Sequence, residues 1–486
     1  MEWGEAGKRG RQTVQWAVGA QTLQLRQKDL IPNNSVAFRG ATFWHSSLWT
    51  PNVLQTINNK NTILTMAPAL NPSTHIITLK DNSTSIIYYH LRSLRQNKQQ
   101  QQQLENDDDI QRWTTFCSSV FAYKPSPPPP EYFARHFYND PRCDASLVRV
   151  LIHCPNGASN TDDSNCEDEK MNGEIVSSVR IFRRTLSTGS SSGGGSTIEA
   201  GGIGEVCTSS NHQRRGLSKI LLKDTINIMS TSCDGATGGD EGMSCSLLHA
   251  NPEFRPVYNK VGGYESVSSK WSLVSIELNK LRTAGIGKNW ITRQAIFPQD
   301  VSQLKALHTE YSEKRLITII RSTEYWTNYV SAELNDSLWV LEDDDSIVAW
   351  LSIRKRGDRY QLREFGVDRN KPSISNIITE FSLNRLLGVA LKQIGEDLHV
   401  DVDRKVNLLL PTIILSDMEQ EKMNGVVTNE VGNNREDDYS FFDADNVAEE
   451  NDDGWMYVVF NRSEPNVLEL TMREKCKHLI WPTDSF

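Results

Sequence analysis

Residues 204–222 read GEVCTSSNHQRRGLSKILL, and they are the most informative segment of the chain. An apolar, β-branched segment leads into a polar loop that contains a glycine, and the loop leads into a helix with apolar residues such as Leu217 and Leu221. A glycine at the start of a helix lets backbone N–H groups close on a ligand, and the helix dipole favours an anion there. The sequence therefore predicts a strand, an anion-binding loop and a helix, with Arg214 and Arg215 adding positive charge.

A polar turn that caps an amphipathic helix is the plainer interpretation of the same loop, because loop–helix junctions of this composition are common. The surrounding sequence favours phosphate binding. An apolar strand ends shortly before the loop, a second apolar strand is expected over 246–250, and a short helix that carries Tyr258 is expected over 252–261.

The order Gln213-x-x-Gly216-x-Ser218 resembles the Gln/Arg-x-x-Gly-x-Gly/Ala loop of the GNAT N-acetyltransferases, with serine at the last position. The resemblance covers residues 75 to 480 and is strong from 198 to 278. It implies acetyl-CoA as co-substrate, with the pyrophosphate on the loop and pantetheine on the preceding strand. The implied cofactor-binding residues are Val206, Cys207, Thr208, Gln213, Arg214, Arg215, Gly216, Leu217 and Ser218.

The hydrophobic patterns predict an order of elements that is also that of the GNAT fold. We expect helices over 109–123 and 131–138, strands over 146–152, 174–186 and 198–208, the helix from Leu217, and a closing strand over 271–278. The predicted fold class is α/β (α+β), a GNAT acyl-CoA N-acyltransferase fold with a mixed central sheet, followed by a second, degenerate GNAT-like domain.

The second domain is predicted because a similar cycle of elements starts at Arg293. Its last strands are expected over 405–415 and 455–461. The segment after Gly366 has no Gln/Arg-x-x-Gly-x-Gly loop, so a second pyrophosphate site is not expected. The arrangement resembles tandem GNAT proteins such as the Eis-type and the fungal lysine N6-acetyltransferases. The expected organisation is a disordered or transit-like segment over 1–70, a catalytic domain over 75–280, and the degenerate domain over 290–486 with a disordered acidic insert at 417–453.

Two residues are candidates for acid–base chemistry. Glu205, on the strand before the loop, is a candidate general base; the alternatives are a salt-bridged strand residue, a water relay or an acceptor that loses its own proton. The stretch from Val257 to Tyr264 resembles the family's Tyr-x-x-x-Gly-Phe/Tyr element with one extra glycine, which implies that Tyr258 protonates the departing thiolate. A core tyrosine between helix and sheet is the alternative. His249 is expected to be structural, and a proton relay is the alternative.

Composition limits the other functions. The 486 residues carry a net charge of −9, which argues against a general nucleic-acid binder and permits a cationic substrate. The eight cysteines show no metal-ligand spacing, so no metal site is predicted. No apolar run is long enough to cross a membrane. We expect a cytoplasmic protein, with organellar import through the N-terminal segment as an alternative.

The leading prediction is therefore an N-acetyltransferase that moves the acetyl group of acetyl-CoA to an amine acceptor by direct attack in a ternary complex. The acceptor is a small molecule or a lysine-type amine, and no residue separates the two. Glu310, Tyr311, Trp326 and Trp350 are expected to be packing or cleft-wall residues of the second domain. Glu310, Glu364 or Asp368 could attract an ammonium group there. A catalytically inactive CoA-binding or scaffold protein is the alternative function. The sequence does not indicate the oligomeric state.

Overall fold

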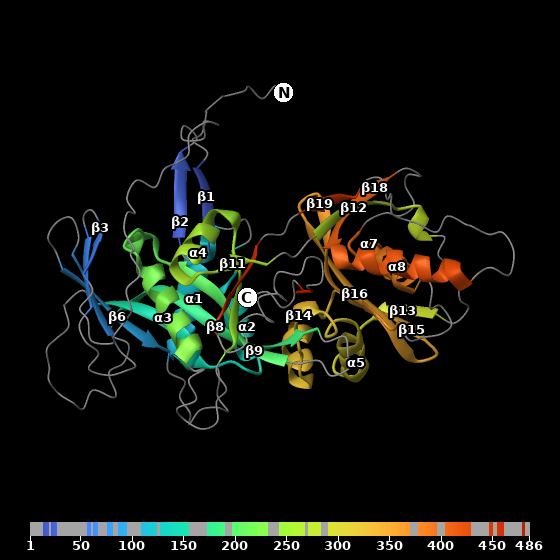
Figure 1. Ribbon diagram of the computed structural model, residues 1–486, viewed down its shortest axis with the longest axis horizontal. Helices are drawn as coiled ribbons and strands as arrows, with labels where there is room; N and C mark the ends of the chain where they lie inside the picture. The colour runs from blue at the N-terminus through green and yellow to red at the C-terminus, as the bar shows by residue number, and fades with distance from the viewer. Residues whose placement is uncertain are drawn as a thin grey trace, which may run out of the picture.

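The protein consists of two mixed α/β units that lie side by side (Figure 1). The computed structural model describes residues 13–18, 21–26, 56–59, 62–66, 75–80, 86–94, 108–123, 127–154, 173–189, 197–231, 243–267, 271–282, 290–369, 378–395, 404–428, 447–450, 454–460 and 479–481. The Gln-rich, polar and Gly-rich segments of the sequence at 97–107, 156–172 and 232–242 lie outside these residues.

The first unit is built on an eleven-stranded sheet. Its strands are β3 (Thr56–Asn59), β4 (Thr62–Met66), β5 (His75–Lys80), β6 (Ile86–Ser93), β7 (Val148–Cys154), β8 (Glu174–Thr188), β9 (Thr197–Thr208), β10 (Cys245–His249), β11 (Glu265–Ser266), β14 (Leu316–Ile319) and β20 (Trp455–Val459). Strands β6 to β9 form an antiparallel meander. Helix α3 (Leu217–Thr231) then returns the chain so that β10 pairs parallel to β9.

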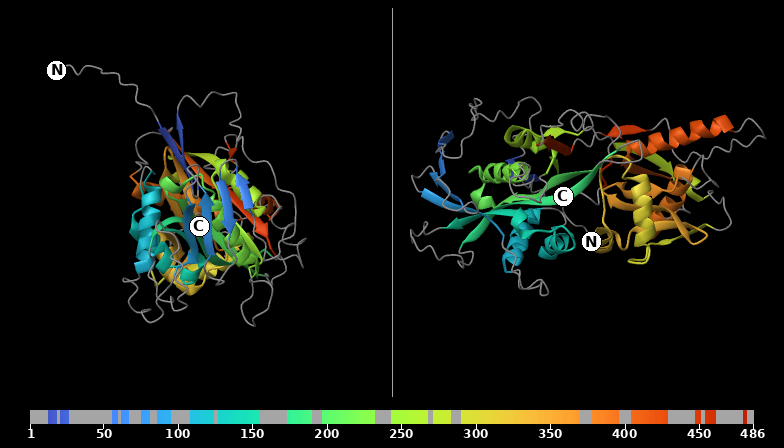
Figure 2. Two further views of the ribbon diagram at one scale, coloured as in Figure 1. Left: turned by 90° about the vertical axis from the view of Figure 1, so that its left-hand side faces the viewer. Right: turned by 60° about the horizontal axis from the view of Figure 1, so that its bottom comes forward.

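Helices cover both faces of this sheet (Figure 2). Helices α1 (Asp108–Val120) and α2 (Pro130–Tyr138) pack on one face, where Trp113 and Phe137 are fully buried. Proline at the first position of α2 suits a helix start, because its missing N–H would have no intrahelical partner there. Helices α3 and α4 (Arg255–Gly262) pack on the other face through Leu221 and Tyr258.

The second unit repeats this order around a seven-stranded sheet. Its strands are β12 (Trp271–Glu277), β13 (Trp290–Gln294), β15 (Leu338–Asp343), β16 (Ser346–Arg356), β17 (Arg359–Val367), β18 (Lys405–Pro411) and β19 (Ala448–Glu450). Its helices are α5 (Val301–Tyr311), a π-helix (Tyr325–Val330), α6 (Ser331–Leu334), α7 (Ile378–Gln393) and α8 (Thr412–Thr428). Strands β15 to β17 form a meander, and α7 leads to β18, which pairs parallel to β17. The predicted fold class is confirmed.

The two units exchange strands, which the sequence did not reveal. Strand β12 was expected to close the first sheet, but it pairs antiparallel with β18 in the second sheet. Conversely β20, expected in the second unit, pairs antiparallel with β10 in the first sheet. Strand β14 also crosses over and pairs with β8. Each expectation followed sequence neighbours, whereas these strands pair with partners far along the chain.

Two further expectations differ from the structure. The strand expected over 405–415 ends at Pro411, and the acidic insert expected from Asp417 begins inside helix α8. Asp417 is buried because its carboxylate accepts from Arg315 and Arg369, both at 2.6 Å. Within the segment expected to be disordered or transit-like, the described residues form strands: β1 (Thr13–Val18) pairs with β2 (Gln21–Arg26), and β3 with β4.

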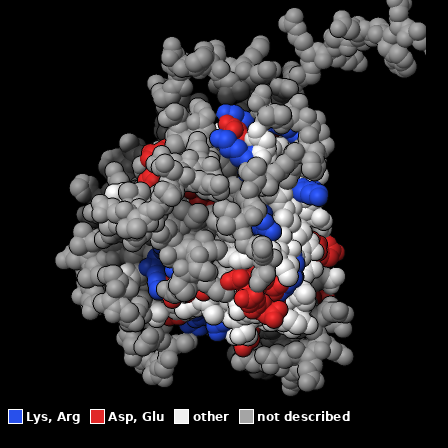
Figure 3. Space-filling model, turned by 90° about the vertical axis from the view of Figure 1, so that its right-hand side faces the viewer, with Lys and Arg blue, Asp and Glu red and all other residues white. Residues whose placement is uncertain are grey.

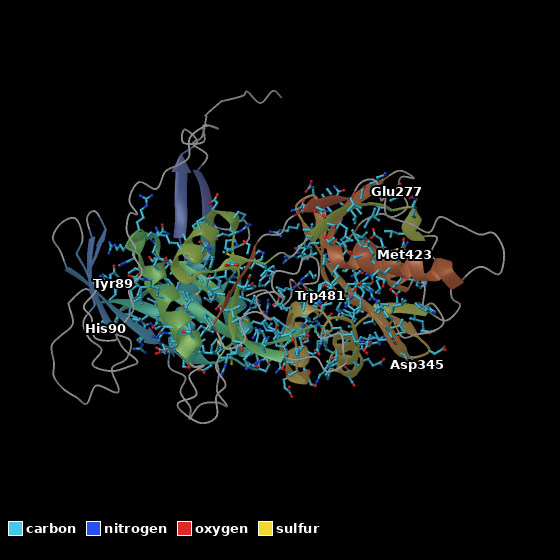
Figure 4. All side chains as sticks on the ribbon, in the orientation of Figure 1. Tyr89, His90, Glu277, Asp345, Met423 and Trp481 are labelled. Carbon is cyan, nitrogen blue, oxygen red and sulfur yellow. The ribbon has the colours of Figure 1, made fainter. Side chains whose placement is uncertain are left out.

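The described C-terminal segment, 479–481, docks between the units. Leu479 exchanges hydrogen bonds with β14, its N–H with the Leu316 carbonyl at 3.1 Å and its carbonyl with the Thr318 hydroxyl at 2.8 Å. Trp481 is fully buried, lies between the two units (Figure 4), and donates its indole N–H to Ser312 at 3.2 Å. All three apolar side chains of this segment are therefore buried.

The surface at the second unit's end of the molecule carries both signs of charge (Figure 3). Basic side chains are scattered over it, and acidic ones gather toward its lower edge in this view. Among the described residues, no helix is long and apolar enough to cross a membrane.

The strand exchange predicts that Trp455→Ala destabilises the first unit, although position 455 lies near the end of the chain. Trp455 is 3% exposed and packs in the core below β10, so truncation should lower the free energy of unfolding by about 3–5 kcal/mol. The measurement is a urea-unfolding curve. Met423→Ala on α8, at a side chain 72% exposed, is the control and should stay within about 0.5 kcal/mol. If Trp455→Ala and Met423→Ala gave the same urea-unfolding curve, the exchange of strands between the units would be contradicted.

Candidate active site

The loop between β9 and α3 holds the predicted anion-binding residues. Gly216 adopts φ 78° and Arg214 φ 63°, both in the left-handed region. A Cβ at position 216 would have no described atom within 4 Å, so the space in front of the helix is open. Leu217 and Ser218, both buried, begin α3, and the first N–H groups of a helix have no intrahelical partner. The chain thus directs backbone donors and a positive helix end toward one open space.

Arg215 fastens this loop to strand β6. Its Nη1 donates to the Tyr89 hydroxyl at 2.7 Å, and that hydroxyl lies 3.0 Å from His212 Nδ1. Figure 4 labels Tyr89 on β6. Burial raises the pKa of Tyr89, and Arg215 opposes the rise. Burial, with Arg215 and His153 nearby, lowers the pKa of His212 to about 4, so its imidazole is neutral at neutral pH.

Strand β9 separates from β10 just before the loop. The two strands pair in register only from Ala200 to Ile203, while β9 continues to Thr208. The backbone from 204 to 208 therefore lacks a ladder to β10, although its other edge stays paired with β8. The side chains of Val206, Cys207 and Thr208 are buried. Gln213 Nε2 lies 3.4 Å from the Thr208 carbonyl, which ties the loop to the strand end.

Cys207 faces α1, on the face of the sheet opposite to α3. Its Sγ lies 3.9 Å from Sγ of Cys117, and both side chains are fully buried. Burial raises the pKa of the Cys117 thiol well above its ordinary value. The Cys207 carbonyl accepts from the Ser177 hydroxyl at 2.9 Å. This cysteine packs the strand against a helix.

Glu205 sits at a bulge in β9. Its φ is 52°, and the register with β8 shifts between Ser178 and Arg180. A left-handed conformation costs a non-glycine residue about 1–2 kcal/mol, and bulges of this kind re-aim side chains next to active sites. The side chain is 8% exposed, and Oε1 lies 3.6 Å from Arg180 Nη1. Burial raises the pKa of the Glu205 carboxyl, and Arg180 opposes the rise.

Glu205 and three further charged residues, with side chains at most 8% exposed, form what we call the Arg180 cluster: Asp140, Arg180, Arg184 and Glu205. Arg184 donates to Asp140 at 2.8 Å, and Arg180 lies 3.5 Å from the same carboxylate. The Arg180 guanidinium also stacks 4.0 Å from the ring centroid of Phe182. Two cations thus balance two carboxylates, and the loss of any one would leave an uncompensated buried charge.

Tyr258 lies on α4, on the opposite face of the sheet from the Arg180 cluster. It is 5% exposed, and burial raises the pKa of its hydroxyl far above the ordinary value. The helix is fixed because the Tyr264 hydroxyl donates to Ser246 at 2.7 Å. The extra glycine of the motif has a structural reason. Gly263 caps the helix in the left-handed conformation, while a Cβ on Gly262 would approach Tyr264 to 2.8 Å.

The second unit reaches the Glu205 side of the sheet through Glu333. This carboxylate accepts from Arg135 and His136 of α2, each at 2.9 Å, and Arg363 of β17 lies 3.4 Å away. Burial alone would raise the pKa of Glu333, but the hydrogen bond from His136 and the nearby arginines outweigh it and lower the pKa to about 2. The edge of the candidate site is therefore made by both units.

The other second-unit residues mostly lie in its core. Tyr311, Trp326 and Trp350 are buried there, which confirms their packing role. Glu364 is fully buried in a two-point ion pair with Arg321, with Oε1 at 2.6 Å from Nη2. The suggestion that Glu364 attracts an ammonium group is therefore wrong. Glu310 is exposed and pairs with Lys314 on the surface of α5. Asp368 directly follows β17, and its backbone N–H donates to the Val348 carbonyl at 2.8 Å. Phe486 and the terminal carboxylate lie outside the described residues.

Residues 103–236, which include α1 to α3 and the loop, match the family model of the acetyltransferase (GNAT) domain. This segment is a GNAT acetyltransferase domain. The protein is accordingly an acyltransferase. A search of curated proteins finds no match.

Solved structures with a similar arrangement come from several organisms. A probable N-acyltransferase from Enterococcus faecalis V583 is 11% identical with a TM-score of 0.45, over 76% of this chain and 73% of that one. Eis1 from Mycobacterium abscessus is 12% identical with a TM-score of 0.37, over 66% and 65%. Saccharomyces cerevisiae N-myristoyltransferase is 12% identical with a TM-score of 0.41, over 80% and 86%.

Sequence reasoning missed two features of this site. Arg180 and Asp140 gave no signal because isolated charged residues in strands and loops are usually exposed. The second feature is a group of three potential metal ligands, His153, Glu174 and His212, whose ligand atoms lie within 4.8 Å of one another. They come from three separate elements, so no motif spacing could have shown them.

Glu333→Gln should loosen the contact between the units in a pH-dependent way. A carboxyl with its pKa lowered from 4.5 to about 2 stabilises the fold above pH 4.5, and this contribution is lost as the pH falls toward 2. We expect the variant to lose about 2–3 kcal/mol at pH 7, with a smaller difference from the parent protein at pH 3. Urea unfolding at both pH values measures this. Glu131→Gln, an exposed site on α2, is the control, and a pH-independent difference would contradict the assignment.

Proposed function

We propose that this protein transfers the acetyl group of acetyl-CoA to an amine acceptor by direct attack in a ternary complex. The observation that carries the proposal is the separation of β9 from β10 directly beside the glycine loop of α3. A pyrophosphate would bind the loop through N–H groups of 216 to 218, with Arg214 and Arg215 adding charge. The pantetheine arm would run along the backbone of Val206, Cys207 and Thr208, whose edge toward β10 is outside the ladder.

Glu205 is the proposed general base. The amine must lose a proton before it attacks, and for an ordinary lysine this costs about 4–5 kcal/mol at neutral pH. A buried carboxylate with a raised pKa accepts a proton more readily than an exposed one. Arg180, 3.6 Å away, keeps the carboxylate charged in its buried setting. The bulge directs this side chain to the face covered by α1 and α2, where the acceptor would enter.

Tyr258 is the proposed general acid, on the opposite face of the sheet. The amine nitrogen bonds to the acetyl carbon, the C–S bond breaks, and the thiolate takes the tyrosine proton while Glu205 takes the proton of the amine. A phenol with a strongly raised pKa stays protonated until the thiolate forms. Base and acid would therefore act from the two faces across the gap between β9 and β10.

The acceptor cleft is proposed to lie between α2 and the second unit. His136 on α2 contacts Glu333, and its ring lies 5.5 Å from that of Tyr329 and 4.2 Å from that of Tyr132 on the same helix. Ligand sites tend to form at such boundaries between domains. A small-molecule amine and a lysine side chain both suit this position, and the second unit would contribute to acceptor binding without holding cofactor.

Arg215→Glu combined with Gly216→Asp tests the cofactor site. The double change places two carboxylates where the pyrophosphate would bind, so acetyl-CoA should bind about 10- to 100-fold more weakly. Isothermal titration gives both affinity and stoichiometry, with one acetyl-CoA per chain expected. Lys223→Glu, an exposed charge reversal on the same helix, is the control. Unchanged affinity in the double variant, or two molecules per chain, would contradict the proposal.

Glu205→Gln tests the base. Below its pKa the carboxyl is protonated and cannot accept a proton, so kcat of the parent protein should rise with pH through that pKa. In the Glu205→Gln variant kcat should no longer rise with pH in this way, and it should be about 100- to 10,000-fold lower than in the parent protein. Tyr258→Phe should lower kcat but keep its rise with pH. Glu199→Gln, on the same strand as Glu205 and paired with Arg142, is the control. Free-thiol release over a panel of amines measures the rates. Binding of acetyl-CoA without turnover of any amine would favour a CoA-binding scaffold.

A further inference from the structure

Three potential metal ligands converge beside the cofactor loop. His153 lies near the end of β7, Glu174 is the first residue of β8, and His212 lies in the loop after β9. The antiparallel register of β7 and β8 places His153 directly opposite Glu174. One ligand atom from each of the three residues lies within 4.8 Å of the other two.

We propose that His153, Glu174 and His212 bind a divalent transition metal ion of the zinc type. Two imidazoles and one carboxylate suit such ions, and zinc sites with three protein ligands keep a fourth position open. Calcium and magnesium prefer a larger set of oxygen ligands, which a single carboxylate does not provide. The site would carry two positive charges from the metal against one negative charge from Glu174.

The three side chains can close on an ion with small movements. Zinc binds nitrogen and oxygen at about 2.0–2.2 Å, which puts tetrahedral ligand atoms about 3.3–3.6 Å apart. His212 is 7% exposed and held in place, whereas His153 is half-buried and Glu174 is exposed, so these two can adjust by rotation. The rings of His153 and His212 already lie with centroids 4.8 Å apart.

Tyr89 supports the orientation of His212. Its hydroxyl lies 3.0 Å from Nδ1, which leaves Nε2 for the metal. A ligating histidine ordinarily donates its other ring N–H to a polar partner, which fixes the tautomer and the ring. Tyr89 is fully buried, and its ring also lies 5.6 Å from that of His153. Arg215 contacts Tyr89 from the loop, at 2.7 Å from the hydroxyl.

This last contact connects the metal site to the loop that the proposed function assigns to acetyl-CoA. A bound ion would fix His212 and Tyr89, and through them Arg215. It would also add positive charge close to the pyrophosphate position. Metal and acetyl-CoA should therefore bind with positive coupling, and each should tighten the other by the same factor, about 5- to 150-fold. The coupling rests on the proposed function, whereas the metal site does not.

The first test titrates Zn²⁺ alone into the full-length chain after treatment with a chelator. We expect one tightly bound Zn²⁺ per chain, and a visible Co²⁺ absorption spectrum typical of nitrogen and oxygen ligands. His212→Ala, His153→Ala and Glu174→Gln should each lower zinc affinity by more than the roughly 10- to 100-fold expected for Tyr89→Phe. His249→Ala, an exposed histidine of the same unit, is the control and should leave zinc affinity unchanged.

Stoichiometric zinc binding that survives all three ligand substitutions would overturn the site, and so would the absence of binding by a folded chain that still binds acetyl-CoA. The second test repeats the acetyl-CoA titration with and without Zn²⁺. Tighter acetyl-CoA binding in the presence of zinc, lost in His212→Ala, supports the coupling. Equal affinity overturns the coupling alone. Failure of acetyl-CoA binding under both conditions counts against the proposed function and leaves the metal titration to decide the site.

Discussion

The left-handed backbone at Glu205 is the constraint on which the arrangement of the candidate active site depends. A residue with φ 52° inside β9 interrupts the ladder with β8, and the strand end beyond it has no ladder to β10. The same residue turns its carboxylate into the buried Arg180 cluster. The conformation is unfavourable for a side chain other than glycine. Compensating buried charges and the packing of α1 and α2 hold it in place, as is usual for strain at functional positions.

The two units form one structural body because each completes the other's sheet. Strand β20 covers the edge of β10, β14 extends β8, and β12 lies inside the second sheet. Glu333 adds charged contacts between α2 and the second unit. The second unit is therefore not dispensable, since its chain supplies strands to the sheet that carries the first unit's candidate site.

Local signals in the sequence predicted much of the first unit. The Gly216 loop, the strand before it and α3 were recognisable because their periodicity changes at a glycine. Strand partners were not recognisable. Trp271 and Trp455 begin apolar strands of similar composition. The neighbouring sequence does not indicate to which of the two sheets each strand belongs. Helix α8 was missed because acidic residues from Asp417 onward read as a solvated loop, while the partners of Asp417 come from distant elements. The histidines beside Glu174 were missed for the same reason.

The exchange of strands also has a consequence for how the chain folds as it is made. The parallel neighbour of β9 is complete at His249, but β20, which covers the exposed edge of β10, is synthesised roughly 200 residues later. At a translation rate of 5–20 residues per second, the edge of β10 stays uncovered for about 10–40 s before β20 has been synthesised. An uncovered apolar edge strand invites pairing with other chains. The first unit is therefore expected to expose this edge during synthesis until β20 has left the ribosome.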